Sequence, residues 1–221
     1  MAGCRGEPGL IELGLKFTLA YMLGSMLGSL VVGKLRGGVD IRSLGSGNAG
    51  GTNALRTQGK TFALLVMIID VGKGILAVLL IPGLDLPLVG IDASVDRELL
   101  FFSVAFAVIL GHVYPLWFGF RGGKGGATAA GLLCVIAPML APAILVIWIA
   151  IVYLTGFVGL ATMGSTVAAT VILAWTRWPQ GQALVVFSAC VSVLIVYTHR
   201  SNIHRMIKGT ESRMRRAHRG D

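Results

Sequence analysis

Two glycine-rich segments of this sequence have the composition expected of anion-binding loops. Residues 45–56 read GSGNAGGTNALR, and residues 119–128 read GFRGGKGGAT. Glycine lets backbone N–H groups approach an anion closely, while arginine and lysine add charge-assisted hydrogen bonds. The two segments therefore predict a pair of phosphate-binding loops, and for the first segment a plain flexible connector is the alternative.

Polar and basic side chains accompany these glycines at close spacing. The second segment lacks the GxxxxGK[ST] pattern, so it is not a Walker A site. No Asp or Glu occurs between Leu99 and Thr210, which argues against a carboxylate base or a carboxylate-held metal near this segment. We therefore expect no metal at the site. The candidate phosphate ligands in the two segments are Ser46, Asn48, Thr52, Asn53, Arg56, Gly122, Gly123, Lys124 and Gly125.

The composition is that of an integral membrane protein. Of the 221 residues, 55% are hydrophobic and 13% are charged, whereas soluble domains carry about 25% charged residues. The net charge of +9 fits cytoplasmic loops beside an anionic leaflet and anionic substrates. Nucleic acid is not an expected partner, because the sequence offers no soluble basic domain.

The apolar residues gather into six stretches long enough to cross a bilayer. The stretch 127–155 is long and contains Pro138 and Pro142, so we divide it into two short helices, with a partly re-entrant region as the alternative. This gives about seven transmembrane helices in an all-α fold. The stretches are 13–35, 61–81, 99–118, 127–155, 157–176 and 181–198.

The charges of the connecting segments predict the orientation. Residues 34–60 hold five basic residues and one acid, residues 82–98 hold four acids and one base, and the tail from His199 holds seven Lys and Arg. The positive-inside rule then gives an N-out, C-in topology with both glycine-rich loops in the cytoplasm. We expect one membrane domain over residues 1–212 and a basic tail, disordered or on the lipid surface, over residues 213–221.

Several polar and charged residues lie in apolar or basic surroundings, where we expect them to have polar partners. Asp70 and Lys73 lie three apart within an apolar stretch, which predicts a structural ion pair that also orients a loop. His199 and Asn202 are also three apart, so a continuing last helix would place them on one face. Glu211 is the one acid of a basic stretch and is expected to hold the tail to a loop cation. In the first stretch, Gly24, Ser25, Gly28 and Ser29 form small-xxx-small pairs suited to close helix packing.

Taken together, these segments resemble the bacterial acyl-phosphate-dependent glycerol-3-phosphate acyltransferases, the PlsY family. The resemblance runs from about Leu19 to Glu211, and three motifs occur in the family's order. The family has Ala at Gly51, Val at Gly126 and a Ser-Leu-Ala-Ser segment where residues 159–162 read GLAT, so only Thr162 keeps a hydroxyl there. The matching residues are Gly45 to Asn48, Thr52, Asn53 and Arg56; Gly111, His112, Gly122 to Gly125, Ala127 and Thr128; and His199, Arg200, Asn202 and Gly209 to Glu211, together with Asp70, Lys73 and Gly74.

The resemblance implies a reaction and its participants. A fatty acyl group would pass from long-chain acyl phosphate to the 1-hydroxyl of sn-glycerol 3-phosphate, giving lysophosphatidic acid and phosphate without a cofactor. The enzyme would lie in the bacterial inner membrane with its active site facing the cytoplasm, as a monomer or else a homo-oligomer. A substrate phosphate oxygen, His199 or His112 would be the general base, and a transporter for a phosphorylated solute is the alternative function. Implied catalytic residues are Ser46, Arg56, His199 and Asn202; implied further phosphate ligands are His112, Thr128, Thr162 and Arg200; implied structural residues are Asp70, Lys73 and Glu211.

Overall fold

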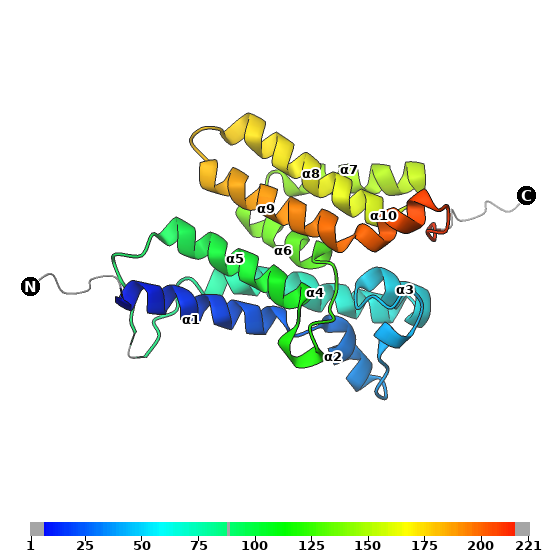
Figure 1. Ribbon diagram of the computed structural model, residues 1–221, viewed down its shortest axis with the longest axis horizontal. Coiled ribbons are helices and arrows are strands. Elements are labelled where there is room, and N and C mark those ends of the chain that lie inside the picture. The colour runs from blue at the N-terminus through cyan, green and yellow to red at the C-terminus, as the bar shows by residue number, and fades with distance from the viewer. Residues whose placement is uncertain (1–6, 88, 215–221) are drawn as a thin grey trace, which may run out of the picture. The chain divides into compact units, whose positions relative to one another are not determined.

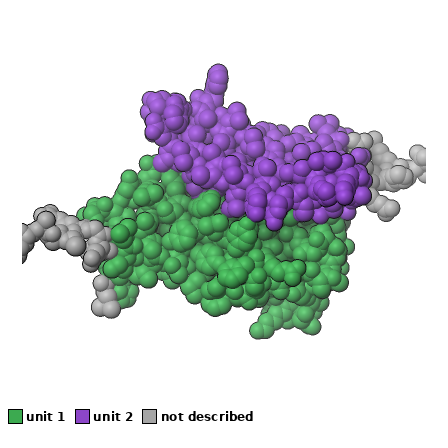
Figure 2. Space-filling model, in the orientation of Figure 1, with its two compact units in different colours: residues 1–136 green, residues 137–221 purple. Residues whose placement is uncertain are grey.

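The computed structural model describes residues 7–87 and 89–214, and within these ranges all named elements are helices. The all-α membrane fold predicted from the sequence is confirmed. The chain forms two compact units, residues 1–136 and residues 137–221 (Figures 1 and 2). Unit 1 contains α1 (Glu7–Gly24), α2 (Gly28–Leu35), η1 (Ile41–Ser43), α3 (Gly51–Gln58), α4 (Lys60–Leu80), α5 (Arg97–Val113), η2 (Leu116–Phe118) and α6 (Gly126–Ile136). Unit 2 contains α7 (Ala141–Thr155), α8 (Val158–Arg177), α9 (Gln182–Thr198) and α10 (Arg200–Ile207).

The described helices include segments that can cross a membrane. By length and composition, Lys60–Leu80, Arg97–Phe118 and Val158–Arg177 each qualify alone. Two bent pairs, α1 with α2 and α9 with α10, also qualify if each pair is one span, while α6 and α7 are shorter apolar helices. The division between α6 and α7 falls at residues 137–140, where the prolines predicted it. The count of seven spans and the N-out orientation stay predictions.

The first predicted span, 13–35, is not one continuous helix. Its helix breaks at residues 25–27 and bends by 46° between α1 and α2. At the break, Nζ of Lys73 donates to the carbonyl oxygens of Gly24 and Met26, both at 2.9 Å. Asp70 Oδ1 accepts from the Gly28 N–H at 3.1 Å. The ammonium therefore meets the negative end of α1 and the carboxylate meets the positive end of α2, which is the favourable arrangement for both helix dipoles.

Glycines let the helices of unit 1 approach closely. Figure 1 shows α1 and α5 side by side, and a Cβ at Gly111 would lie 2.0 Å from the Tyr21 carbonyl oxygen. Likewise, a Cβ at Gly24 would lie 2.2 Å from the Val108 carbonyl oxygen, and one at Gly131 of α6 would lie 2.2 Å from that of Val71 in α4. These backbone contacts leave no room for a methyl group, and they confirm the close packing predicted for Gly24.

A small apolar core supports the first glycine-rich loop. It contains Val32 of α2, Ile41 of η1, Ala54 of α3, and Phe62 and Val66 of α4, all buried. Ile41, before the loop, and Ala54, in α3, therefore both pack against α2 and α4. This packing holds the two ends of the loop in place.

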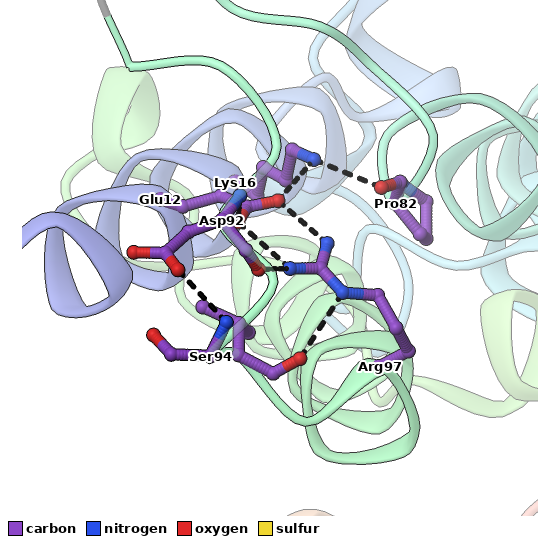
Figure 3. Close-up of polar contacts among 7 residues, drawn as sticks. Glu12, Lys16, Pro82, Asp92, Ser94 and Arg97 are labelled. Carbon is purple, nitrogen blue, oxygen red and sulfur yellow. Dashed lines mark hydrogen bonds and ion pairs between the residues drawn. The ribbon is translucent and has the colours of Figure 1, made fainter.

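A second charged cluster, which the sequence did not single out, ties α1 to the segment before α5 (Figure 3). Glu12 and Lys16 are fully buried and lie 2.7 Å apart, and Lys16 also donates to the Pro82 carbonyl oxygen at 2.9 Å. Arg97 donates to both carboxylate oxygens of Glu12, at 2.7 and 2.9 Å. The Asp92 N–H donates to Glu12 as well, so Glu12 has three partners and Lys16 has two.

In unit 2, hydroxyl groups join α8 to α9. The Thr170 hydroxyl lies 2.7 Å from that of Ser188 and 2.8 Å from that of Ser192, which also donates to the Thr166 carbonyl oxygen. Hydrogen bonds between membrane helices of this kind strengthen their association.

The close approach of α1 and α5 leads to a stability prediction. We expect Gly111→Ala to destabilise the protein by about 1–3 kcal/mol, because the added methyl group collides with the backbone of α1. Gly14→Ala is the matched control, since a Cβ at Gly14 meets nothing within 4 Å and alanine favours helix. Thermal unfolding in detergent compares the two, and equal melting temperatures would contradict the packing described.

Candidate functional site

Asn53 organises the first glycine-rich loop from inside. Its amide Nδ2 lies at 2.9–3.0 Å from the carbonyl oxygens of Ile41, Leu44 and Asn48, and its Oδ1 accepts from the Ser46 N–H at 2.9 Å. The side chain is buried. The structure thus commits the Asn53 amide, predicted as a phosphate ligand, to shaping the loop. Gly45 adopts φ +57° directly over it, and a Cβ there would lie 2.4 Å from Asn53 Oδ1.

The loop ends at the N-terminus of α3, whose N-cap is Gly50. Thr52 lies in the first turn of this helix, and Arg56 is exposed one turn later. The first N–H groups of a helix have no partner within it, and they carry a partial positive charge. Ser46 is exposed and Asn48 is half-buried on the loop that leads into this helix.

Arg42 joins the two glycine-rich loops. Its Nη1 donates to the carbonyl oxygens of Phe118 and Arg121, at 3.0 and 3.2 Å, and its guanidinium lies over the Phe118 ring. Nε and Nη2 of the same side chain bind both carboxylate oxygens of Asp40 at 2.7–3.1 Å. The Asp40 carboxylate therefore fixes the orientation of the Arg42 guanidinium, and Nη1 of that guanidinium holds the second loop beside the first.

The second loop is attached to the end of α5 through its backbone. The N–H groups of Gly122 and Gly123 donate to the carbonyl oxygens of Val113 and His112, at 3.1 and 3.0 Å. Side chains cannot fit there, because a Cβ at Gly122 or Gly123 would lie 2.1 Å from the His112 carbonyl oxygen or from its Nε2, respectively. These two glycines, predicted to bring N–H groups to an anion, instead bring the chain against His112.

The second loop also ends at a helix N-terminus, that of α6 at Gly126. Gly125 adopts φ +88° just before it, and its carbonyl oxygen accepts from the Ala129 N–H. Lys124 is half-buried at this start, and Thr128 is buried in the first turn with a hydroxyl that has no hydrogen-bond partner in the described part of the chain. Lys124 and the opening N–H groups of α6 thus form the second anion-attracting helix start.

His112 is held by the pair Asp70 and Lys73. Its Nδ1 lies 2.8 Å from Lys73 Nζ and 3.4 Å from Asp70 Oδ1. An ammonium has only donors, so Nδ1 accepts from Lys73 and the ring proton sits on Nε2. A nitrogen that carries the proton cannot be a general base, which argues against that role for His112. The ion pair predicted between Asp70 and Lys73 is present, at 3.0 Å.

In unit 2, His199 occupies the junction between α9 and α10, where the chain bends by 53°. Its Nδ1 lies 2.7 Å from the Ile195 carbonyl oxygen, which can only accept. In neutral His199 the proton therefore sits on Nδ1, and Nε2 is a hydrogen-bond acceptor. Asn202, one turn later, donates from its backbone to the His199 carbonyl oxygen at 2.8 Å. The two residues are brought together as their spacing predicts.

Glu211 fastens the end of the described tail to α10. Its Oε1 accepts from Asn202 Nδ2 at 2.7 Å, and its Oε2 pairs with Arg205 Nε at 2.5 Å. These contacts fit the predicted structural role of Glu211, although the cation is Arg205 of α10 and not one in a glycine-rich loop. They also orient the Asn202 amide.

The remaining predicted residues of unit 2 lie near the same helix ends. The Thr162 hydroxyl donates to the Val158 carbonyl oxygen at 3.0 Å and accepts from Trp148 Nε1, while exposed Arg200 stacks on Tyr197. Arg213 lies over Phe157, and the Met214 N–H donates to the Gly156 carbonyl oxygen. The start of the predicted basic tail thus contacts the turn between α7 and α8, while residues 215–221 lie outside the described residues.

Asp40 and Arg42, which hold the two loops together, were not predicted as site residues from the sequence. Arg42 was counted only as a charge for orientation, because its acceptors on the second loop are backbone carbonyls that no sequence pattern marks. For metals, residues 7–87 and 89–214 contain no cluster of three or more His, Cys, Asp or Glu side chains that could hold an ion.

Comparison with known proteins places this geometry in a family. The model of the family described as glycerol-3-phosphate acyltransferase matches residues 15–209. A glycerol-3-phosphate acyltransferase of Bordetella pertussis is 40% identical over 210 residues, which cover 94% of each chain. One of Bacillus cytotoxicus is 40% identical over 194 residues, covering 87% of this chain and 90% of the relative.

Two crystal structures of PlsY, an integral membrane glycerol 3-phosphate acyltransferase, resemble the fold. The glycerol 3-phosphate form superposes with a TM-score of 0.78 at 34% identity, and the lysophosphatidic acid form with 0.76 at 33%. Each comparison covers 91% of this chain and 94% of the other.

The pair Asp40 and Arg42 predicts a pH dependence of stability. The Arg42 guanidinium holds the pKa of the Asp40 carboxyl below its usual value. A carboxyl whose pKa is lower in the folded chain stabilises the fold above its unfolded pKa, and this contribution is lost as the pH falls through the folded pKa. We therefore expect Asp40→Asn to melt below the parent protein at about pH 6, with the difference shrinking below about pH 4.

Asp85→Asn is the control, because Asp85 has no ion-pair partner among the described residues. Melting curves of the three proteins across this pH range provide the measurement. A pH-independent difference between Asp40→Asn and the parent would show that the charge of Asp40 does not stabilise the loops.

Proposed function

This chain belongs to the glycerol-3-phosphate acyltransferase family of phospholipid synthesis, and we propose that its acyl donor is a long-chain acyl phosphate. The acceptor is then the 1-hydroxyl of sn-glycerol 3-phosphate. The hydroxyl oxygen bonds to the acyl carbonyl carbon, the bond from that carbon to the phosphate oxygen breaks, and the hydroxyl proton goes to a base. The products are lysophosphatidic acid and inorganic phosphate.

The observation that carries the proposal is the pairing of two glycine-rich loops that both open onto helix N-termini. The first leads into α3 and the second into α6, and Arg42 binds one to the other. A reaction between two phosphate-bearing substrates needs two adjacent anion sites, and the two helix N-termini suit them. Arg56 in the last turn of α3 and Lys124 just before α6 add a positive charge to each loop region. The two ligand forms of the related PlsY structures support glycerol 3-phosphate and lysophosphatidic acid as substrate and product.

The main task of the protein in this reaction is to orient the two substrates. Acyl phosphate is an activated mixed anhydride, so orientation of the hydroxyl against the carbonyl supplies much of the acceleration, about 7–11 kcal/mol in well-oriented cases. N–H groups of the loops or the Asn202 amide would stabilise the oxyanion as it forms. His199 is the side chain best suited as base, because its Nε2 is an acceptor in the neutral tautomer. A substrate phosphate oxygen is the remaining alternative.

The donor is tested with purified protein in detergent. We expect phosphate release that requires both acyl phosphate and glycerol 3-phosphate, and no product with an acyl thioester. Arg56→Ala and Lys124→Ala should each lower kcat/KM at least tenfold, since a hydrogen bond to a charged group contributes about 1.5–3 kcal/mol.

Lys60→Ala, at the start of α4, is the matched control because it removes an exposed cation close to Arg56 in the sequence. Its kcat/KM should stay near that of the parent protein. Equal activity with acyl thioester would reject acyl phosphate as the specific donor, and a normal kcat/KM in either loop variant would remove that residue from the site.

The site is proposed to face the cytoplasm of a bacterial cell, in the inner membrane. In a variant without native cysteines, a cysteine at position 92 should react with a membrane-impermeant maleimide added outside, because Asp92 lies in the acidic segment between α4 and α5. A cysteine at position 58, after the first loop, should react only once the membrane is opened. The reverse pattern would place the loops outside the cell.

A further inference from the structure

A buried chain of polar contacts runs from the break in the first span to the second glycine-rich loop. Lys73 Nζ contacts the carbonyl oxygens of Gly24 and Met26, Asp70 Oδ1 and His112 Nδ1, all at 2.8–3.0 Å. Lys73 is 3% exposed and His112 is 2% exposed. On the far side of the imidazole, Nε2 faces Gly123, where even a Cβ would be too close. The ring is therefore enclosed between an ammonium and the loop.

The ammonium decides which nitrogen of the ring carries the proton. With Lys73 donating to Nδ1, the proton of the neutral ring must sit on Nε2, which then presents an N–H to the second loop. Without Lys73, the nearest side-chain group is Asp70 Oδ1, 3.4 Å from Nδ1. A carboxylate only accepts, so Nδ1 would take the proton and Nε2 would turn a lone pair toward the loop.

We propose that Lys73 is a positioning residue for the reaction: it holds His112 as the Nε2–H tautomer, so that the phosphate-binding second loop rests on a donor and not on a lone pair. This rests on the proposed function, because it concerns the loop assigned to a substrate phosphate. Among the described residues, His112 Nε2 has no hydrogen-bond partner, and its N–H points to the loop that contains Lys124. A lone pair at the same place would repel an anion, whereas an N–H attracts it.

Asp70 has a separate part in this cluster. Its Oδ1 receives the Gly28 N–H and the Lys73 ammonium, while its Oδ2 is buried without a partner. Asp70→Asn keeps an acceptor for Gly28 and removes the competing carboxylate from the neighbourhood of Nδ1. The variant therefore leaves Lys73 as the donor to His112 and should preserve the tautomer.

The tautomer is measured directly by ¹⁵N NMR of histidine-labelled protein in detergent, with the His112 signal assigned by its absence in His112→Gln. In the parent protein we expect Nε2 protonated and Nδ1 unprotonated, and we expect the same in Asp70→Asn. Nδ1 protonated in the parent would overturn the proposal. This result does not depend on substrate, so it separates failure of the proposal from failure of the proposed function.

The kinetic test asks whether Lys73 acts through His112. Lys73→Met should raise the apparent KM for a phosphate substrate by about tenfold, the loss of roughly one hydrogen bond to a charged group, with a smaller change in kcat. Glutamine mimics the Nε2 donor without tautomers, so Lys73→Met should have a much smaller effect in the His112→Gln background. Equal effects of Lys73→Met in both backgrounds would overturn the proposal.

Lys16→Met is the matched control, since Lys16 is another fully buried lysine of unit 1 in an ion pair with a carboxylate one turn away (Figure 3). It should lower the melting temperature and leave the KM values of the folded protein unchanged. A KM rise as large as that in Lys73→Met would show a general effect of lost stability and would overturn the specific role of Lys73.

Discussion

A helix break that is buried away from water leaves backbone groups in need of partners, and in this chain Lys73 and Asp70 supply them. The ammonium takes the carbonyl end of α1 and the carboxylate takes the N–H end of α2. Either charge alone would be costly here, because both side chains are buried. Between two helix ends of opposite polarity, the two charges stabilise the break and each other.

The rest of unit 1 follows from where this break directs the chain. Helix α2 leads away from it into the apolar core that holds Ile41 and Ala54, and hence into the first loop. His112 binds the same ammonium and supports the second loop, which packs against it. Arg42, just before the first loop, then binds the Phe118 and Arg121 carbonyl oxygens at the beginning of the second. Both loops are therefore fixed at two points each, which suits sites that must bind phosphate in a set geometry.

Much of this architecture could be predicted from the sequence, because hydrophobic length and glycine-rich motifs are local signals. The all-α membrane fold, the division near Pro138 and Pro142, the ion pair of Asp70 with Lys73 and the family itself are confirmed. The break at residues 25–27 was missed because Ser25-Met26-Leu27 contains no proline, and the groups that stabilise it lie more than 40 residues away. Hydrophobicity alone cannot reveal a helix end that is capped from another helix.

The glycines and Asn53 show a different limit of sequence reasoning. These residue types correctly predict loops in which the backbone comes close to another group, but the sequence does not identify that group. Gly122 and Gly123 approach His112, and the Asn53 amide binds its own loop. The family relationship favours the acyltransferase over the transporter that the same cationic loops allowed.

The buried cluster around Glu12 also bears on how the protein is made (Figure 3). Glu12 and Lys16 can pair as soon as α1 forms, since they are one turn apart. The guanidinium that completes the cluster, Arg97, is synthesised 85 residues after Glu12. Until α5 is made, the Glu12 carboxylate lacks the two hydrogen bonds that Arg97 donates to it. The polar contacts that hold Glu12 in α1 are therefore complete only after α5 has formed beside it.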